Sequence, residues 1–393
     1  MDFETLLAER TKTMKASMIR EILKVLERPG VISLAGGLPA PASFPLHLMA
    51  ELTEKVIEKY ESNAFQYSLT EGFMPLREAL VSYLKTRNIS TTAGDILITS
   101  GSQGLLDQVG KIFISEGDVV AVEAPTYLAA IQAFNPYGAS YKTIATDDDG
   151  CVPEALEETI KNNKIKFVYL IPTFQNPTGR TTTLERRKQI ADIIQKYNVL
   201  LVEDDPYCDL RYRGTPIPPI QTFAPEHVIY ASTLSKVFAP GLRIGFTVAP
   251  ESIRKWLVFA KQGIDLHTST FNQALAAEYI SNGYLEKHLP EIIKLYKPKQ
   301  ETMLEALDTY FPDIYHYIKP EGGMFIWVEG PSGMDMEDFY WNAIENKVAY
   351  VPGKYFYTNH NDGIETMRLN YTMASSDAIK AAIKRLSEVL PKK

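Results

Sequence analysis

The sequence has little of what marks several large classes of protein. Its 393 residues include only two cysteines, Cys151 and Cys208, and six histidines. Two thiols this far apart form no disulfide framework, and without a C-x-x-C pair or a histidine cluster we expect no metal site. No apolar run approaches the roughly 18 residues of a membrane span, and the acidic start M-D-F-E-T-L-L-A-E-R is unlike a signal peptide. These absences favour a protein of the reducing cytoplasm that does not enter a membrane.

Positive charge is also scarce in this chain. The 41 Lys and Arg residues are outnumbered by 48 Asp and Glu, which gives a net charge of -7. Because binding to a nucleic-acid backbone needs a basic face, the composition argues against a nucleic-acid partner. The length exceeds that of one ordinary hydrophobic core and fits one large domain plus a smaller one.

From Asp95 onward, short apolar runs alternate with segments of helical pattern. The runs include D-V-V-A-V-E, K-F-V-Y-L-I-P and N-V-L-L-V-E-D-D, and residues 184–197 are typical of the helical segments between them. Continuous apolar runs separated by helices indicate parallel strands that are covered on both faces. The sequence therefore predicts an α/β fold, with a mostly parallel sheet between two helical layers. R-I-G-F-T-V-A-P follows the same pattern and is expected to be another such strand.

The C-terminal part has a different pattern. A long polar helix is expected over about 285–309, followed by G-G-M-F-I-W-V-E, a further helix and M-R-L-N-Y. This α+β pattern predicts a small domain over 285–393, after a large domain over 46–284. Residues 1–45 precede the strand–helix series, so we expect them to pack with the small domain, with a helix over 1–28.

Two polar stretches follow predicted strands, where ligands bind in open α/β sheets. S-G-S-Q-G (100–104) opens a helix, and free N–H groups at a helix N-terminus bind anions, although an ordinary capping serine would also explain Ser100 or Ser102. In N-P-T-G (176–179), Asn176 is held by Pro177 and is suited to donate to a ligand oxygen. A turn with no function would show the same residues.

A third stretch, E-D-D-P-Y (203–207), ends an apolar strand with three carboxylates. Such carboxylates are costly unless they are paired or exposed, and capping of the next segment accounts for Asp205. Asp204 and Tyr207 are three residues apart and are spaced to converge on one ligand. A carboxylate beside a pyridine nitrogen would keep that nitrogen protonated.

The fourth stretch, S-T-L-S-K-V-F-A-P-G-L-R-I-G-F (232–246), holds two cations among apolar and hydroxyl residues. The simplest explanation is a strand, a turn and two surface cations. Alternatively, the apolar neighbours of Lys236 lower its pKa, as a lysine nucleophile requires. Thr233, Ser235 and Arg243 would then hold a phosphate.

Together the four stretches describe one ligand with four recognisable groups. It has a phosphate, an aldehyde that reacts with a lysine, a ring oxygen and a ring nitrogen. Pyridoxal phosphate has all four, and proteins bind it through a lysine Schiff base and an acidic partner for the ring nitrogen. The residues suited to these groups are Ser102, Thr233, Ser235 and Arg243 for the phosphate, Lys236 for the aldehyde, Asn176 and Tyr207 for the oxygen, and Asp204 for the nitrogen.

On these stretches the chain resembles the fold-type I pyridoxal-phosphate-dependent aminotransferases of class I/II. Within them it is most similar to the 2-aminoadipate, kynurenine and aromatic aminotransferase group. The resemblance runs almost end to end, and the order and spacing of its motifs are far more specific than any one of them. The motifs are S-L-A-G-G-L-P-A-P-A-S-F-P, Q-Y-S-L-T-E-G-F-M-P-L-R, S-G-S-Q-G-L, N-P-T-G, E-D-D-P-Y and S-K-V-F-A-P-G-L-R-I-G-F.

The resemblance implies a role for each matching residue. Lys236 would form the Schiff base and move the substrate proton, and Arg368 would grip the substrate carboxylate as a bidentate fork. Tyr127 would stack on the cofactor ring, and Tyr67 would reach the phosphate of a neighbouring subunit, which implies a homodimer with shared sites. The full set comprises the catalytic residues Lys236, Asp204 and Tyr207, the further cofactor residues Ser102, Gln103, Tyr127, Asn176, Thr233, Ser235, Arg243 and Tyr67, and the substrate residues Arg368, Asn176, Gly37 and Arg20.

The implied activity is transfer of an amino group from an L-amino acid to 2-oxoglutarate by a ping-pong Schiff-base mechanism. The amino donors expected for this group are of 2-aminoadipate, aromatic or branched-chain type. Arg20 would pair with a distal carboxylate, although a surface helix arginine is an equally simple explanation. Two alternatives stay open: a C–S lyase or decarboxylase on the same scaffold, and a non-enzymatic aminotransferase-like regulator domain.

Overall fold

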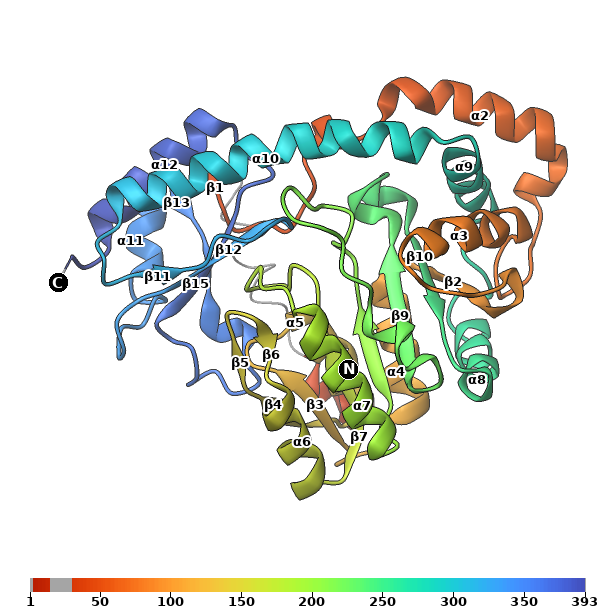
Figure 1. Ribbon diagram of the computed structural model, residues 1–393, viewed down its shortest axis with the longest axis horizontal. Coiled ribbons are helices and arrows are strands. Elements are labelled where there is room, and N and C mark those ends of the chain that lie inside the picture. The colour runs from red at the N-terminus through yellow and green to blue at the C-terminus, as the bar shows by residue number, and fades with distance from the viewer. Residues whose placement is uncertain (1–2, 15–29, 393) are drawn as a thin grey trace.

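The computed structural model describes residues 3–14 and 30–392 (Figure 1). Its large sheet has seven strands in the order β2-β10-β9-β8-β7-β3-β4, and every neighbouring pair is parallel except the two that β10 forms. The predicted α/β fold with a mostly parallel sheet is confirmed. The strands are β2 (Ile96–Ser100), β3 (Val119–Glu123), β4 (Ser140–Ile144), β7 (Ile165–Leu170), β8 (Leu201–Asp204), β9 (Val228–Thr233) and β10 (Ile244–Val248).

Helices cover both faces of this sheet because its strands are apolar on both sides. In β3, Val120 and Val122 pack in the core beneath α4 (Gly101–Phe113), α5 (Leu128–Phe134) and α8 (Glu251–Gln262). Ala121 faces the opposite core, beneath α6 (Pro153–Asn162) and α7 (Leu184–Lys196). Successive side chains of a strand point to opposite faces, so a continuous apolar run fills both cores.

The expectation that residues 244–248 continue the parallel pattern is wrong. β10 is antiparallel to both β9 and β2. Only residues 234–243 separate β9 from β10, and a parallel connection needs a crossover of about a dozen residues or more. This short connection contains both Lys236 and Arg243, so the chain reversal places the two cations at one end of the sheet.

The C-terminal part forms a second, smaller sheet in the order β11-β12-β15-β14, and all of its strand pairs are antiparallel. The long helix α10 runs between the two parts along one edge of the molecule (Figure 1). The elements not yet given are α2 (Leu46–Tyr60), α3 (Met74–Thr86), β5 (Thr146–Asp147), β6 (Gly150–Cys151), α9 (Thr270–Ser281), α10 (Tyr284–Tyr310), β11 (His316–Tyr317), β12 (Phe325–Glu329), α11 (Tyr340–Glu345), β13 (Val348–Ala349), β14 (Val351–Pro352), β15 (Thr366–Asn370) and α12 (Ser376–Val389).

The N-terminal segment joins the C-terminal part of the chain. Strand β1 (Ile32–Ser33) pairs in parallel with β13, and the backbone N–H of Asn370 in β15 donates to the Leu34 carbonyl at 2.7 Å. These contacts join residues 32–34 to the small domain, whereas the Thr13 hydroxyl donates to the Asn135 carbonyl of the large domain at 3.1 Å. We keep the packing of residues 1–45 with the small domain, and the division at 46–284 and 285–393, as proposals.

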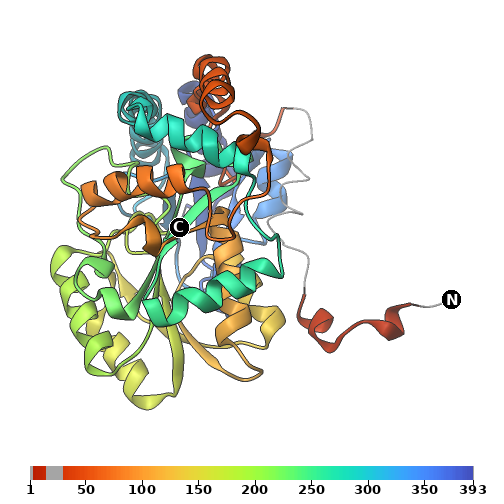
Figure 2. The same cartoon turned by 90° about the vertical axis from the view of Figure 1, so that its right-hand side faces the viewer.

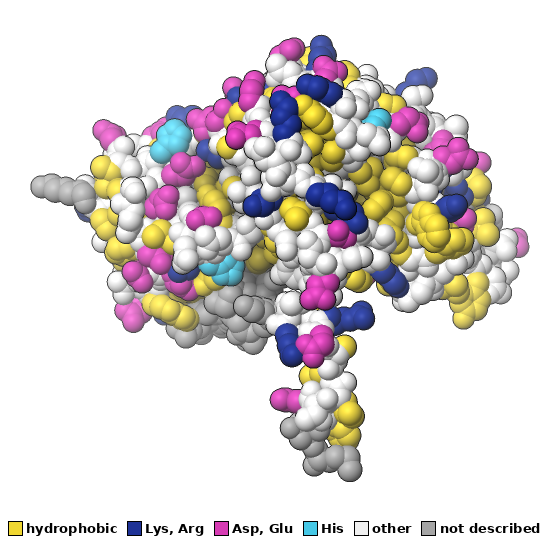
Figure 3. All heavy atoms as spheres, turned by 90° about the horizontal axis from the view of Figure 1, so that it is seen from below, with side chains coloured by type: hydrophobic (Ala, Val, Ile, Leu, Met, Phe, Trp, Pro, Cys, Tyr) yellow, Lys and Arg dark blue, Asp and Glu magenta, His cyan; other side chains and the backbone are white. Residues whose placement is uncertain are grey.

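Residues 3–14 do not form the helix that was expected over 1–28. They form two short 3-10 turns, Glu4–Leu6 and Glu9–Thr13, in an arm that projects from the body (Figures 2 and 3). Neither turn buries a residue, and short helices depend on tertiary packing for stability. Residues 15–28 of that predicted helix lie outside the described residues. Among residues 3–14 and 30–392, no helix is both long and apolar enough to cross a membrane.

Candidate functional site

The candidate site lies where the large sheet, the small sheet and the N-terminal segment meet. Asp204 is the last residue of β8, and Lys236 ends the 3-10 turn Leu234–Lys236 that follows β9. Arg368 comes from β15 of the small sheet, and its Nη2 donates to the Ala35 carbonyl of the N-terminal segment at 2.8 Å. The site is therefore assembled from segments that are far apart in the sequence.

Asp204 is a buried carboxylate with only one of its oxygens bonded. It is 1% exposed, and its Oδ2 accepts a hydrogen bond from the Tyr169 hydroxyl at 2.8 Å. Its Oδ1 is buried with no hydrogen-bond partner among the described residues. Burial raises the pKa of Asp204 to about 7, while the Tyr169 hydrogen bond and the charge of Lys236 oppose that rise. A buried oxygen of this kind calls for a partner, and a cationic group on a ligand would satisfy it.

Lys236 has the properties of an activated amine. Burial, and to a lesser extent the positive charges of Arg368 and Arg243, lower its pKa to about 8. Its Nζ donates to the Gly37 carbonyl at 3.2 Å and lies 5.9 Å from the Tyr207 ring centroid. A lysine with a lowered pKa has a substantial neutral fraction near neutral pH, and the neutral amine is the nucleophile.

Asn176, Tyr207 and Arg368 form a chain of buried polar contacts. The Asn176 amide donates to the Tyr207 hydroxyl at 3.3 Å, and Arg368 Nη1 donates to Asn176 Oδ1 at 2.8 Å. Arg368 is 3% exposed, burial lowers its pKa to about 10, and its Nε has no partner among the described residues. Its guanidinium lies 4.3 Å from the Phe325 ring centroid. An arginine oriented in this way still has N–H groups with which to bind a carboxylate.

The residues predicted to hold a phosphate lie around the start of α4. Thr233 Oγ1 and Ser235 Oγ are 2.8 Å apart, and Arg243 Nη2 donates to the Ser100 carbonyl at 3.2 Å. Gly101 begins α4 with a φ of +71°, and a Cβ added there would lie 2.4 Å from Arg243 Nη2. The close approach of Arg243 to the helix N-terminus therefore requires glycine at position 101, and it gathers a cation, hydroxyls and free N–H groups suited to an anion.

Of the other predicted residues, some lie near this cluster and others do not. Tyr127 is half-buried at the start of α5, and burial, with a smaller contribution from the charge of Asp204, raises its pKa to about 12. The Gln103 amide donates to the Ala129 carbonyl at 3.0 Å, and Ser102 lies beside it in the first turn of α4. Tyr67 is 79% exposed, and its ring centroid lies 5.8 Å from that of His267. Within its own chain it does not contact the other predicted site residues that the structure describes. Arg20 lies outside the described residues.

The residues that are present fit pyridoxal phosphate. The buried and unpartnered Asp204 Oδ1 suits a protonated ring nitrogen, and the arrangement of Arg243 and Gly101 suits a phosphate. Lys236 suits an aldehyde because its pKa is lowered, and Asn176 with Tyr207 places two polar groups for a ring oxygen.

Sequence analysis missed two residues that support this site. Tyr169, in K-F-V-Y-L-I-P, reads as an ordinary strand tyrosine, but its hydroxyl binds Asp204. The available signal was the two-residue period of the strand, which places Tyr169 on the same face as Phe167, beneath α5.

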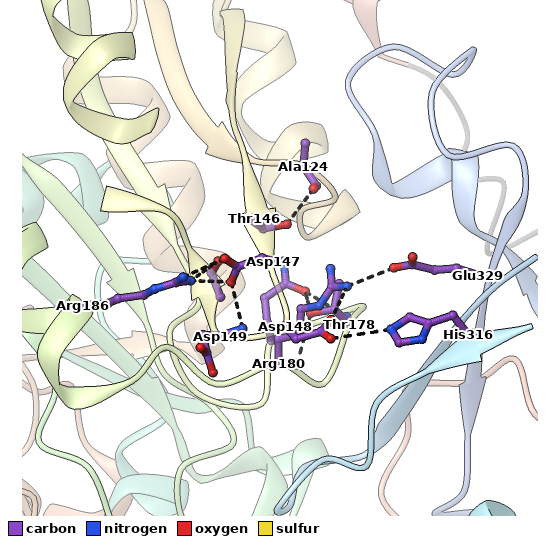
Figure 4. Close-up of polar contacts among 12 residues, drawn as sticks. Ala124, Thr146, Asp147, Asp148, Asp149, Thr178, Arg180, Arg186, His316 and Glu329 are labelled. Carbon is purple, nitrogen blue, oxygen red and sulfur yellow. Dashed lines mark hydrogen bonds and ion pairs between the residues drawn. The ribbon is translucent and has the colours of Figure 1, made fainter. Parts of the chain in front are cut away.

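The second missed residue is Arg180, which follows N-P-T-G directly. Its Nη2 binds Asp148 Oδ1 at 3.1 Å, in the β5–β6 hairpin, and Glu329 Oε1 at 3.0 Å, at the end of β12 (Figure 4). His316 Nε2 of β11 lies 3.6 Å from Asp148 Oδ2. The loop that carries Asn176 is therefore also connected to the small sheet at its outer end.

A fold and a site of this kind define a class of protein, the pyridoxal-phosphate-dependent transferases of fold type I. Comparison with known proteins narrows the class. Residues 33–386 match the model of the family described as aminotransferase class I and II, and the chain belongs to that family. It is an aminotransferase, as the resemblance predicted.

Relatives of the chain are similar over nearly their whole length. The chain is 47% identical to aromatic-amino-acid aminotransferase 1 of Thermococcus litoralis, over 99% of this chain and 95% of the relative. It is 42% identical to 2-aminoadipate transaminase of Thermus thermophilus, over 96% and 94% of the two chains. A solved structure of Pyrococcus horikoshii kynurenine aminotransferase, in complex with PMP, superimposes with a TM-score of 0.95 at 47% identity, over 99% and 97% of the two chains.

Proposed function

We propose that this aminotransferase moves the amino group of an aromatic, 2-aminoadipate or branched-chain L-amino acid to 2-oxoglutarate by a ping-pong mechanism. The observation that carries the proposal is the convergence of Lys236, Asp204 and Arg368, three buried or part-buried ionisable groups with shifted pKa values. Perturbed groups cluster at functional sites, and these three match an amine nucleophile, an anion for a cationic ring and a carboxylate clamp. The names of the relatives support the aromatic and 2-aminoadipate donors of this proposal.

Pyridoxal phosphate, when bound, supplies an aldehyde that links to amines and an electron-poor ring that makes the Cα proton of an amino acid acidic. Lys236 provides the amine, and its lowered pKa leaves Nζ able to take up and return a proton near neutral pH. The Gly37 carbonyl holds Nζ in position from the N-terminal segment.

Four residues hold the ring, in our proposal. Asp204 presents Oδ1 to the ring nitrogen, and its negative charge keeps that nitrogen protonated. Asn176 and Tyr207 bind the ring oxygen, and Tyr127 stacks against the ring face. Together these side chains hold the cofactor in one orientation.

The phosphate is held at the start of α4, where Arg243 provides the charge. The residues of this group are Ser102, Gln103, Thr233, Ser235 and Arg243. On the substrate side, Arg368 binds the α-carboxylate while Asn176 holds the arginine from the other side. Gly37 lies beside the Lys236 amino group, where we propose that the substrate binds. Arg20 remains a candidate to bind a distal carboxylate of the substrate.

The working unit in this proposal is a homodimer in which Tyr67 completes the site of the neighbouring subunit. Tyr67 is 79% exposed beside Phe65 at 67% and Leu69 at 61%, an apolar surface suited to an interface. Light scattering should give twice the monomer mass, and a monomer with full activity would contradict this part. We also propose a cytoplasmic location, because Cys151 and Cys208 are both unpaired thiols.

Lys236→Ala tests the proposed function directly. We expect no turnover and no cofactor that borohydride attaches covalently to the protein, whereas the unaltered enzyme is labelled at Lys236. A panel of amino donors with 2-oxoglutarate, read by glutamate formation, then tests the substrates. Ammonia or carbon dioxide released without an oxo acid would instead indicate the lyase or decarboxylase, and full activity of Lys236→Ala would contradict the whole proposal.

A further inference from the structure

Tyr169 makes a buried contact with Asp204 that the proposed chemistry does not yet use. The side chain lies on β7 and is fully buried, and its hydroxyl donates to Asp204 Oδ2 at 2.8 Å. Its ring packs edge-on against Phe134, with centroids 6.0 Å apart and an interplanar angle of 81°. The hydroxyl is therefore held in one direction by the packing of the ring.

We propose that Tyr169 is a positioning residue that keeps Asp204 ionised and reserves its Oδ1 for the ring nitrogen of the cofactor. The inference rests on the proposed function, and it goes further by assigning separate tasks to the two oxygens of Asp204. One oxygen is held by Tyr169, and the other has no partner among the described residues. A hydrogen bond to one oxygen restricts the rotation of the carboxylate and so favours one position for the free oxygen.

The surroundings of Asp204 have opposing effects on the ionisation of its carboxyl group. Burial and the neighbouring Asp205 favour the protonated acid, whereas the Tyr169 hydrogen bond and Lys236 favour the carboxylate. Tyr127 and Tyr207 also interact electrostatically with this carboxyl, and both are neutral near pH 7 because burial raises their pKa values, that of Tyr127 to about 12. Tyr169 therefore supplies the hydrogen bond that favours the ionised form in a setting that otherwise penalises the charge.

The state of Asp204 matters because it would share a proton with the ring nitrogen. A donor on Oδ2 lowers the proton affinity of the carboxyl, so the shared proton stays on the ring. Without that donor the proton moves toward Asp204 and the bound cofactor loses positive charge. The ring then withdraws electrons less strongly, and any second proton on the cofactor is held more tightly.

Tyr169→Phe tests the inference in the holoenzyme, because it removes one oxygen atom and keeps the packed ring. Since a hydrogen bond to a charged group shifts a pKa by about one unit, we expect the pH midpoint of the visible absorbance of bound cofactor to rise by about one unit. On the same basis, we expect kcat to fall about tenfold and the dissociation constant of the cofactor to rise about tenfold. KM should change less than about twofold because Arg368 is untouched.

Tyr230→Phe is the matched control. Tyr230 is also fully buried, and its hydroxyl donates to Asp205 Oδ2 at 2.9 Å, so the same atom is lost beside the adjacent carboxylate. We expect a lower melting temperature with an unchanged absorbance midpoint. Replacement of Tyr169 by 3-fluorotyrosine introduces a stronger donor of similar size, so the packing of the ring is kept. We expect this replacement to lower the pH midpoint of the cofactor absorbance.

Three results would overturn the inference: an unchanged midpoint in Tyr169→Phe holoenzyme, the same shift in Tyr230→Phe, or an upward shift with 3-fluorotyrosine. If Tyr169→Phe does not fold, the 3-fluorotyrosine measurement decides alone. Failure of the proposed function looks different, because the unaltered enzyme would then carry no cofactor that borohydride attaches to Lys236.

Discussion

Two links join the large and small sheets through one loop, and they differ in depth. The inner link is the hydrogen bond of Asn176 to Arg368, and Arg368 is 3% exposed. The outer link is the ion pair of Arg180 with Glu329, whose side chain is 35% exposed. Asn176 and Arg180 lie four residues apart, so the same loop provides one contact within the site and one at its outer edge. Figure 4 shows the outer contact.

The two links differ in what their charges can do, because one arginine is buried and the other ion pair is exposed. At the inner link, burial lowers the pKa of Arg368 to about 10, so a carboxylate ligand would relieve the penalty of an unpaired cation. At the outer link water screens the charges, and exposed ion pairs contribute about 1 kcal/mol or less to stability. We therefore expect changes near the inner link to alter chemistry and changes at the outer link to alter little.

Asp204→Asn should give the largest effect. We expect kcat to fall about 100- to 1000-fold, the range for removal of one partner of a buried ion pair. Steady-state kinetics with saturating cofactor measures this. A kcat within tenfold of the unaltered enzyme would show that the buried carboxylate is not part of the chemistry.

The same variant should affect stability in the opposite direction when the protein is stripped of cofactor. The folded-state pKa of Asp204 is raised to about 7, above its unfolded value, so its contribution to stability is present at low pH and is lost as the pH rises toward and through 7. The melting temperature of Asp204→Asn should therefore exceed that of the unaltered protein by more at pH 8 than at pH 5. A difference in melting temperature that becomes smaller as the pH rises would contradict a raised pKa of Asp204.

Arg368→Lys should give the next largest effect, at the inner link itself. A lysine keeps the charge but loses the planar fork, so we expect KM for the amino acid to rise about 10- to 100-fold. Arg186→Lys is the control, because Arg186 forms an outer ion pair with Asp147 at 2.5 Å. Equal kinetic effects of the two substitutions would remove the distinction between inner and outer charges.

Gly101→Ala should have a moderate effect that is confined to the cofactor. Gly101 has a φ of +71°, which strains an alanine, and the added Cβ would displace the Arg243 guanidinium. We therefore expect the cofactor dissociation constant to rise about tenfold. In Gly104→Ala the nearest atom to the added Cβ is Ser100 Cβ at 3.6 Å, an ordinary contact. Cofactor titration by absorbance separates the two variants, and we expect no loss of affinity in the control.

Glu329→Gln should give the smallest effect, because it removes one charge from the outer link. We expect the free energy of unfolding to change by less than about 1 kcal/mol, and kcat/KM by less than about twofold. Denaturant unfolding at low and high salt measures the first quantity, and any difference should shrink at high salt. A tenfold loss of kcat/KM would mean that the outer link controls the site after all.

Local sequence was enough to predict the class of fold and to propose candidate residues for the site. The apolar runs between 95 and 248 predicted buried strands because burial on both faces leaves no polar alternation to obscure them. Lys236, Asp204, Asn176 and Arg243 could be selected because each lies in a short motif next to the end of a strand. Gly101, although inside the S-G-S-Q-G stretch, gave no sign that Arg243 would pack against it.

The sequence by itself determined the order of the motifs, and with it the cofactor and the family, because each motif is a local arrangement of a few residues. Only the tertiary structure decided which side chains these residues contact. The Arg368–Asn176 hydrogen bond spans 192 positions and the Tyr169–Asp204 hydrogen bond spans 35. It also reversed β10, which brings Lys236 and Arg243 to the same end of the sheet. Contacts of this kind depend on which strands become neighbours and how their side chains pack, and no local pattern encodes that.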